Sequence, residues 1–111
     1  MGMPDSTDPD LLLRFARSGD REALGILFQR HAGYAYRTAL TVLGDPGMAE
    51  DAVQEAFLKV MRSAGSFDPG RPLRPWLKTL VIRTAMDRLR AERRRTMRES
   101  GAGSRSSAVS R

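Results

Sequence analysis

Cysteine is absent from this chain of 111 residues, and histidine occurs only once. A disulfide framework and a thiolate metal site are therefore excluded, which fits a reducing compartment. No apolar run approaches the roughly 18 residues of a membrane span, and residues 1–10 are acidic where a secretory signal would be basic and then apolar. We expect a cytoplasmic protein with no membrane span, no metal and no cofactor.

Acidic residues are scarce in the second part of the chain. Residues 1–68 hold 7 basic and 10 acidic side chains, a net charge of −3, whereas residues 69–111 hold 12 basic and 3 acidic side chains, a net charge of +9. All but one of those twelve cations are arginines, whose guanidinium groups suit bidentate contacts with phosphate or guanine. The basic block indicates a nucleic-acid partner, because cations that displace condensed counterions gain affinity from their release. For the run RAERRR, a solvated and self-repelling surface is the alternative.

An all-α fold is predicted, because strand patterns are almost missing and four helical segments follow one another between clear breaks. The chain has the length of about one domain, and its 41% hydrophobic residues can form only a small core. We expect a compact bundle of four helices over residues 8–95. Residues 1–7 and the Ser/Gly-rich residues 96–111 lack apolar periodicity, so we expect a disordered N-terminus and a disordered tail or linker.

Aspartates mark the expected starts of the first three helices. Asp8, Asp20 and Asp45 can each serve as an N-cap, and Gly19 and Gly44 end the first two helices. In the sequence DPGMAED, which opens the third helix, we expect the acids in the first turn to oppose the helix dipole. The fourth helix should run from about residue 73 or 75 to about residue 95.

Each of the longer helices carries an apolar stripe with the i, i+3, i+4 spacing that buries one face against a core. The segment GSFDPGRPLRP, between the third and fourth helices, contains too many prolines and glycines for a helix interior, so it should be a shaped loop. The expected core positions are Leu24, Leu27, Phe28, His31, Ala35, Ala39 and Val42 in the second helix, Ala49, Ala52, Val53, Ala56, Phe57, Val60, Met61 and Ala64 in the third, and Leu73, Trp76, Leu77, Leu80, Val81, Ala85 and Leu89 in the fourth.

The third helix carries a second, polar line opposite its apolar stripe. Its members fall at i, i+3, i+4, i+7 and i+11 and are Asp51, Gln54, Glu55, Leu58 and Arg62. Two interpretations remain open from the residues alone. The line is either an ordinary solvated face with one exposed leucine, or an acidic patch that docks a basic partner helix with Leu58 as its apolar anchor.

Catalytic chemistry is not expected. An enzyme needs a converging nucleophile, base or metal site, whereas His31 lies on the apolar side of the second helix, where a packing role is favoured over that of a base. Asp51 and Glu55 are spaced to share a divalent cation, but no third ligand lies near them in the sequence, and hard cations require several oxygens. No catalytic or metal-binding residue is predicted.

Four stretches of the chain carry a family pattern: GDREALGILFQRH, LGDPGMAEDAVQEAFLKV, FDPGRPLRPWL and TAMDRLRAERRR. In this order and at this spacing they resemble region 2 of bacterial sigma factors, specifically the extracytoplasmic-function (ECF) group, over about residues 8–95. The resemblance implies a compact helical bundle that binds core RNA polymerase. It also implies that the domain recognises the promoter −10 element and helps to melt it.

By this resemblance, the third helix docks on the clamp helices of the polymerase β′ subunit. The matching positions are Glu50, Asp51, Gln54 and Glu55, and Leu58 completes the expected polymerase-binding face. The resemblance therefore favours the docking interpretation over the solvated face. An anti-sigma factor covers the same surface in many family members, so a partner of that kind is implied too.

The resemblance also implies a DNA-binding surface. Melting requires a base to leave the stack, and a protein pocket and phosphate contacts must offset that cost. In the family, the loop before the fourth helix forms a pocket for a flipped base of the single-stranded non-template strand, and the start of that helix lies along the strand. The matching positions are Phe67, Asp68, Arg71, Arg74, Trp76, Lys78 and Arg83, with Met86 and Asp87 near them and Arg90, Arg93 and Arg94 extending the basic surface upstream.

Some of these residues have a competing structural role. Trp76 falls on the apolar stripe, where a core position is favoured over a stacking platform, and Phe67 is about equally suited to plugging the loop onto the core. Arg71, Arg74 and Lys78 are the stronger candidates for phosphate contacts, because they project away from the stripe at the loop or the helix start.

The chain departs from the family pattern in two ways. Arg83 occupies a position where the family commonly has asparagine, and arginine only donates hydrogen bonds whereas an amide also accepts them, so the flipped base is not predicted. The helix-turn-helix domain, region 4, is absent, and we favour a fragment of a longer protein as the explanation. The alternative function is a small basic helical DNA-binding protein that does not act with polymerase, which would have no use for the line from Asp51 to Leu58.

Overall fold

The computed structural model describes residues 7–100. Over this range the chain forms four α-helices and one short 3-10 helix, with no β-strand: α1 (Asp8–Ser18), α2 (Arg21–Leu43), α3 (Pro46–Ser63), η2 (Ala64–Ser66) and α4 (Leu73–Ser100). The predicted all-α bundle of four helices is therefore confirmed. Residues 1–6 and 101–111 lie outside the described residues, so the disorder expected for them stays a prediction.

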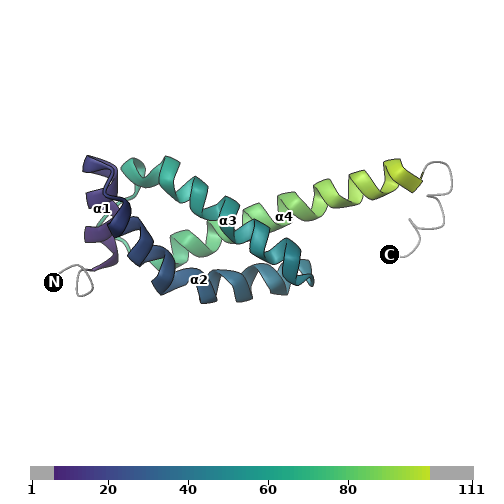
Figure 1. Ribbon diagram of the computed structural model, residues 1–111, viewed down its shortest axis with the longest axis horizontal. Helices are drawn as coiled ribbons and strands as arrows, with labels where there is room; N and C mark the ends of the chain where they lie inside the picture. The colour runs from purple at the N-terminus through teal and green to yellow at the C-terminus, as the bar shows by residue number, and fades with distance from the viewer. Residues whose placement is uncertain (1–6, 101–111) are drawn as a thin grey trace.

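The helices α2, α3 and α4 pack on one another, and α1 lies across one end of the bundle against α2 and η2 (Figure 1). The second half of α4 extends beyond the other helices, at the yellow end of the chain in Figure 1. This projection gives the molecule its elongated dimensions of 58 × 22 × 21 Å. The loop between η2 and α4 lies at the opposite end of α4, close to α1.

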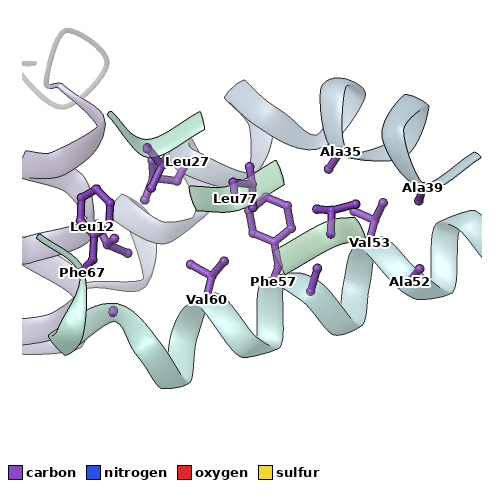
Figure 2. Packing of buried hydrophobic residues seen from close by; sticks show 14 of the residues in the cluster. Leu12, Leu27, Ala35, Ala39, Ala52, Val53, Phe57, Val60, Phe67 and Leu77 are labelled. Carbon is purple, nitrogen blue, oxygen red and sulfur yellow. The ribbon is translucent and has the colours of Figure 1, made fainter. Parts of the chain in front are cut away.

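The core lies between the three long helices and is built largely from small side chains. Alanines make up 8 of the 18 buried hydrophobic residues in the described part of the chain. Small side chains allow helix axes to approach closely, and the larger Leu27, Phe57 and Leu77 fill the remaining space (Figure 2). The apolar stripe predicted for α3 accordingly faces this core, with Ala52, Val53 and Val60 all buried.

Several residues predicted to be core lie at its margin instead. Phe28 is 39% exposed, and its ring meets the edge of Phe57 at a centroid distance of 4.8 Å. The buried face of α4 consists of every fourth residue from Leu73 to Ala85, and the apolar side chains beside it are half-buried. Thr84 is completely buried. Its hydroxyl oxygen accepts a hydrogen bond from Lys59 Nζ at 3.0 Å. The half-buried residues that the sequence assigned to the core are Leu24, Val42, Met61, Trp76, Leu80 and Leu89.

Local capping signals are confirmed for α2 and α3. The carboxylates of Asp20 and Asp45 each accept a hydrogen bond from the backbone N–H three residues further on, at 3.2 and 2.9 Å. Gly19 and Gly44 end the first two helices with φ of 71°, a left-handed conformation that other residues adopt only at a cost. Because α3 begins at Pro46, no acid lies in its first turn, and the expected interaction with the helix dipole there was wrong.

The cap predicted for α1 is also wrong. Thr7 is the N-cap residue, and its hydroxyl oxygen accepts a hydrogen bond from the backbone N–H of Asp10 at 3.2 Å. Thr7 therefore belongs to the folded domain and not to a disordered N-terminus. Asp8 lies one residue inside the helix, so its carboxylate is free of the cap and contacts α2 instead.

The end of α4 differs from the prediction by five residues. The helix continues to Ser100, although apolar periodicity is lost well before that point. Arg95 donates hydrogen bonds to Glu92 and Glu99, three residues before it and four after, and these two carboxylates raise its pKa above the ordinary value. Arginine, glutamate and methionine favour helices, so local propensity and these ion pairs extend α4 without a buried face.

Candidate functional site

The polar line of α3 faces solvent in the structure. We call Glu50, Asp51, Gln54, Glu55 and Leu58 the docking face. Four of these residues are exposed, Leu58 by 49%, whereas Glu55 is half-buried. The prediction that Glu55 would be exposed is therefore only partly correct.

Glu55 is half-buried because Arg88 reaches it from α4. The Nε atom of Arg88 donates a hydrogen bond to Glu55 Oε1 at 3.0 Å, and its Nη1 atom lies 3.9 Å from Asp51 Oδ2. Lys59, one turn further along α3, approaches Glu55 to 3.9 Å. Two acids of the docking face are thus paired within the molecule. The sequence did not predict this role for Arg88, since no pattern links residues 33 positions apart.

An apolar groove runs beside the docking face, between α2 and α3. It has a volume of about 460 Å³, and Gln54 and Leu58 of the docking face line one side of it. Leu24 and Phe28 line the side formed by α2, which explains why Phe28 lies at the margin of the core. The docking face therefore combines acids with an adjacent apolar surface, as protein interfaces do.

The loop before α4 forms a pocket, which we call the loop pocket. Asp68 shapes the loop, because its Oδ1 atom accepts a hydrogen bond from the backbone N–H of Gly70 at 2.9 Å and its carbonyl oxygen accepts one from the backbone N–H of Arg71 at 3.0 Å. Pro69 and Pro72, within the loop, restrict its path. The loop pocket has a volume of about 540 Å³, within the usual range for small-molecule sites, and is lined by Phe67, Asp68, Arg71, Pro72, Pro75 and Trp76.

The two aromatic residues of the loop pocket differ in burial. Phe67 is only 6% exposed and belongs to the core, so it plugs the loop onto the bundle (Figure 2). Trp76 is half-buried, with its ring tilted by 50° against Phe67 at a centroid distance of 4.9 Å. Trp76 therefore packs on the core, one of the two roles considered for it, and also lines the pocket, while its role as a stacking platform stays a prediction.

Arg74 is exposed but held in place by α2. Its guanidinium carbon lies 4.1 Å from the centroid of the Tyr34 ring, within cation–π range, and its Nε atom is 3.4 Å from Nδ1 of His31. His31 is 5% exposed, and its Nε2 atom lies 2.8 Å from Asp8 Oδ2. The predicted packing role of His31 thus includes polar contacts on both ring nitrogens.

The remaining predicted DNA contacts are exposed cations spread along one end of the molecule and one helix. Arg71 is 3.6 Å from Asp68 at the mouth of the loop pocket, and Lys78 and Arg83 follow on α4 without lining the pocket. Arg90 lies about 21 Å further along the axis than Trp76, at a rise of about 1.5 Å per residue. The structure therefore does not bring Arg90, Arg93 and Arg94 to the loop pocket. Asp87 is paired with Arg90 at 2.6 Å, and Met86 is 44% exposed.

A family model described as sigma-70 region 2 matches residues 27–95, which is more than half of the chain. The chain belongs to the sigma-70 region 2 family. The matched residues include α3, the loop pocket and most of α4, so the two candidate surfaces lie in the part that defines the family. Sigma factors are transcription initiation factors and not enzymes.

Curated relatives of this region 2 domain are sigma factors of the ECF group, which confirms the resemblance seen in the sequence. The chain is 43% identical over 100 residues to an ECF RNA polymerase sigma factor SigK from Mycobacterium sp. (strain KMS), covering 88% of this chain and 51% of the relative. It is 38% identical over 77 residues to the RNA polymerase sigma factor CarQ from Myxococcus xanthus, covering 69% of this chain and 44% of the relative. The chain thus spans about half the length of the curated relatives it matches.

A solved structure shares the fold of the region 2 domain. It is an NMR structure of an engineered region 2 of sigmaE in complex with GTAAAA, with a TM-score of 0.75 and 33% sequence identity. The similarity covers 82% of this chain and 94% of the solved one. In residues 7–100, no helix is long and apolar enough to cross a membrane, and no cluster of three or more metal-ligating side chains occurs.

Proposed function

We propose that this region 2 domain binds core RNA polymerase through the docking face of α3, and recognises and helps melt the promoter −10 element at the loop pocket. The observation that carries the proposal is the loop pocket itself, a partly aromatic cavity with Arg71 in its lining. A related region 2 domain has been solved in complex with GTAAAA, which supports a role for this fold in binding a short promoter sequence.

The loop pocket has the chemistry that a flipped base requires. Trp76 offers an aromatic surface for stacking, and Asp68 at the rim can accept a hydrogen bond from a base edge. Arg71 lines the pocket, and the exposed Arg74 directly precedes the pocket residues Pro75 and Trp76, so their charges can bind the phosphates that flank such a base. Lys78 and Arg83 continue the positive surface along the first turns of α4. Arg90, Arg93 and Arg94 are too far along α4 for the same nucleotides, and we assign them to duplex upstream.

The docking face has the chemistry that a basic helix requires. Glu50 and Gln54 are exposed, and Leu58 with the apolar groove provides a site for an apolar side chain of the partner. The clamp helices of the polymerase β′ subunit are the partner that family membership supports. Such a domain acts in the bacterial cytoplasm, and an anti-sigma factor that covers the docking face would compete with polymerase.

A pull-down of bacterial core RNA polymerase tests the docking half of the proposal. The wild-type chain should retain polymerase at moderate salt, and Glu55→Lys should lose it, because the substitution places a cation opposite the basic partner. Glu99→Lys, at the far end of α4, makes the same change in net charge and should retain polymerase. Equal retention by all three chains would show that the docking face is ordinary solvated surface.

Fluorescence anisotropy with labelled oligonucleotides tests the DNA half. The chain should bind single-stranded GTAAAA, or one of its single-base variants, more tightly than the corresponding duplex, because a stacked base cannot enter the loop pocket. Equally tight binding to duplex DNA, with no retention of polymerase, would instead support a basic helical DNA-binding protein that acts without polymerase.

A further inference from the structure

Residues from three helices form a series of contacts that ends at the side chain of Arg74. Asp8 at the start of α1 contacts His31 of α2 at 2.8 Å, and His31 in turn contacts Arg74 at the start of α4 at 3.4 Å. Tyr34, one turn beyond His31, lies under the guanidinium group at 4.1 Å. The second oxygen of Asp8 is held by Arg30 at 2.9 Å, which fixes the carboxylate. These contacts form a chain from α1 through α2 to the first turn of α4, where Pro75 and Trp76, the next residues after Arg74, line the loop pocket.

The contacts determine which nitrogen of His31 carries its proton. A carboxylate only accepts hydrogen bonds, so the Nε2 atom next to Asp8 must be the donor. The Nε atom of Arg74 only donates, so Nδ1 of His31 must be the acceptor. Both conditions are met by a single neutral tautomer of His31. Asp8 therefore sets the tautomer that allows His31 to hold Arg74.

The contacts with His31 and Tyr34 leave the terminal guanidinium nitrogens of Arg74 available for a ligand. The Nε atom faces His31 and one face of the guanidinium group lies on Tyr34. The terminal nitrogens retain donors for an oxyanion, and Pro75 and Trp76, the next two residues, line the loop pocket. An unrestrained arginine would lose much rotamer freedom on binding, whereas an arginine already held in position loses less.

We propose that His31 is a positioning residue that, oriented by Asp8 and assisted by Tyr34, presents Arg74 to a phosphate of the single strand bound at the loop pocket. The inference rests on the proposed function of that pocket and extends it to α1 and α2, which sequence reasoning did not connect with DNA. None of the three residues needs to touch DNA. Their effect on binding passes through Arg74.

Two substitutions of His31 separate this role from a purely structural one. The amide nitrogen of glutamine reaches the place of Nε2, so His31→Gln keeps the contact with Asp8 and loses the acceptor for Arg74. The amide oxygen of asparagine takes the place of Nδ1, so His31→Asn keeps the acceptor for Arg74 and loses the contact with Asp8. If His31 is only structural, the affinity for single-stranded DNA should fall in proportion to the loss of thermal stability in both variants. The positioning role predicts weaker binding in His31→Gln and rescue in His31→Asn.

The experiment measures binding of single-stranded GTAAAA and its single-base variants by anisotropy from low to moderate salt. We expect about fivefold weaker binding for His31→Gln, and a shallower slope of log affinity against log salt, which for one lost phosphate contact changes by about 0.7. His31→Asn should bind within about twofold of the wild type. Circular dichroism melts and retention of polymerase show whether each variant folds.

Arg74→Ala distinguishes failure of the inference from failure of the proposed function. If Arg74→Ala binds DNA as the wild type does, Arg74 makes no phosphate contact and the DNA half of the proposed function is wrong at this residue. If Arg74→Ala weakens binding while His31→Gln, folded and retained by polymerase, does not, only the positioning role is overturned.

Substitutions of Tyr34 provide a second and independent readout. Tyr34→Leu removes the aromatic face below the guanidinium group and should weaken DNA binding, whereas Tyr34→Phe keeps that face and should restore it. Equal affinity of Tyr34→Leu and the wild type would show that the ring does not hold Arg74 for DNA.

Discussion

At the scale of single residues, Arg88 links α4 to the docking face on α3. It belongs to α4, the helix whose start borders the loop pocket, yet its side chain pairs with two acids of the docking face on α3. The side chains of Arg88 and Glu55 are 36% and 39% exposed and that of Asp51 is 62% exposed, and such ion pairs contribute only about 0–1 kcal/mol to the free energy of unfolding. Under the proposed function, a basic partner helix would compete with Arg88 for Glu55, so we expect Arg88 to moderate the docking affinity.

Replacing Arg88 should therefore separate stability from docking. We expect Arg88→Gln to lower the free energy of unfolding by at most about 1 kcal/mol, as measured by urea titration. Retention of polymerase should increase at low salt, because Asp51 and Glu55 become available to the partner, and the gain should shrink as salt rises. A loss of retention would mean that Arg88 itself contacts polymerase.

Single residues also show where sequence reasoning succeeds and where it does not. Asp20 and Asp45 were recognised as caps because a cap and the N–H that it accepts lie three residues apart. Asp8 was assigned the wrong role because Arg30 and His31, its partners, lie on another helix. Arg88 and Tyr34 escaped prediction for the same reason. Contacts between distant segments depend on how the helices pack, which no local pattern specifies.

At the scale of elements, α3 is a helix with two independent faces. Phe57 is buried against α2, whereas its neighbour Leu58 is 49% exposed on the docking face. The apolar stripe of α3 could be read from the sequence because its period matches the helix. The polar face could be interpreted only by family resemblance, since solvated and docking surfaces have similar compositions.

Adjacent substitutions in α3 should consequently have opposite effects. We expect Phe57→Ala to lower the free energy of unfolding by about 3–5 kcal/mol, because it leaves a cavity in the core. Leu58→Ala should change it by less than about 1 kcal/mol but weaken retention of polymerase. Thermal melts and pull-downs of the two variants make the comparison. A large stability loss for Leu58→Ala would contradict its placement on the surface.

The helix α4 has two halves with different support. Leu77, Val81 and Ala85 bury its first half, whereas the last turns, from about residue 92, are held by exposed ion pairs around Arg95. Such exposed pairs add little to stability. The predicted end of α4 was too early because the prediction used apolar periodicity, and the last turns of the helix form without an apolar face.

Hydrogen exchange should distinguish these two halves of α4. We expect backbone amides near residues 92–100 to exchange orders of magnitude faster than those near residues 77–85, because local fraying opens the last turns without unfolding the bundle. Raising the salt concentration should speed exchange in the last turns further by screening their ion pairs. Equal protection of both halves would show that other contacts hold the end of the helix.

At the scale of the whole molecule, the two candidate surfaces are separate. The docking face and its groove lie on α3 and α2, whereas the loop pocket lies before α4, and no residue lines both the groove and the pocket. The division of charge seen in the sequence, acidic before residue 69 and basic after it, predicts this separation into two kinds of partner. The loop pocket itself was implied by resemblance, and its walls required the packing of Phe67 on the core.

Substitutions in the two surfaces should therefore act independently. We expect Glu55→Lys to reduce retention of polymerase and leave the affinity for single-stranded DNA unchanged, and Arg71→Ala to do the reverse. In the double variant, each loss should equal that of its single variant within about 0.5 kcal/mol, the additivity expected of distant sites without shared partners. Anisotropy and pull-downs on the four chains test this additivity. Strong coupling would reveal communication between the surfaces, with Arg88 as the connection to examine first.

The contacts that hold Arg74 also bear on the order in which the domain folds. The residues of the docking face belong to a single helix of 18 residues, so local structure brings them together. The DNA-facing end depends on Asp8, His31 and Arg74, which meet across sequence separations of 23 and 43 residues. Contacts of long separation form after local ones, because more chain must be ordered to close them. During synthesis or partial unfolding, the docking face should therefore form first and be lost last. A chain whose DNA-binding end is folded should then already have a folded docking face.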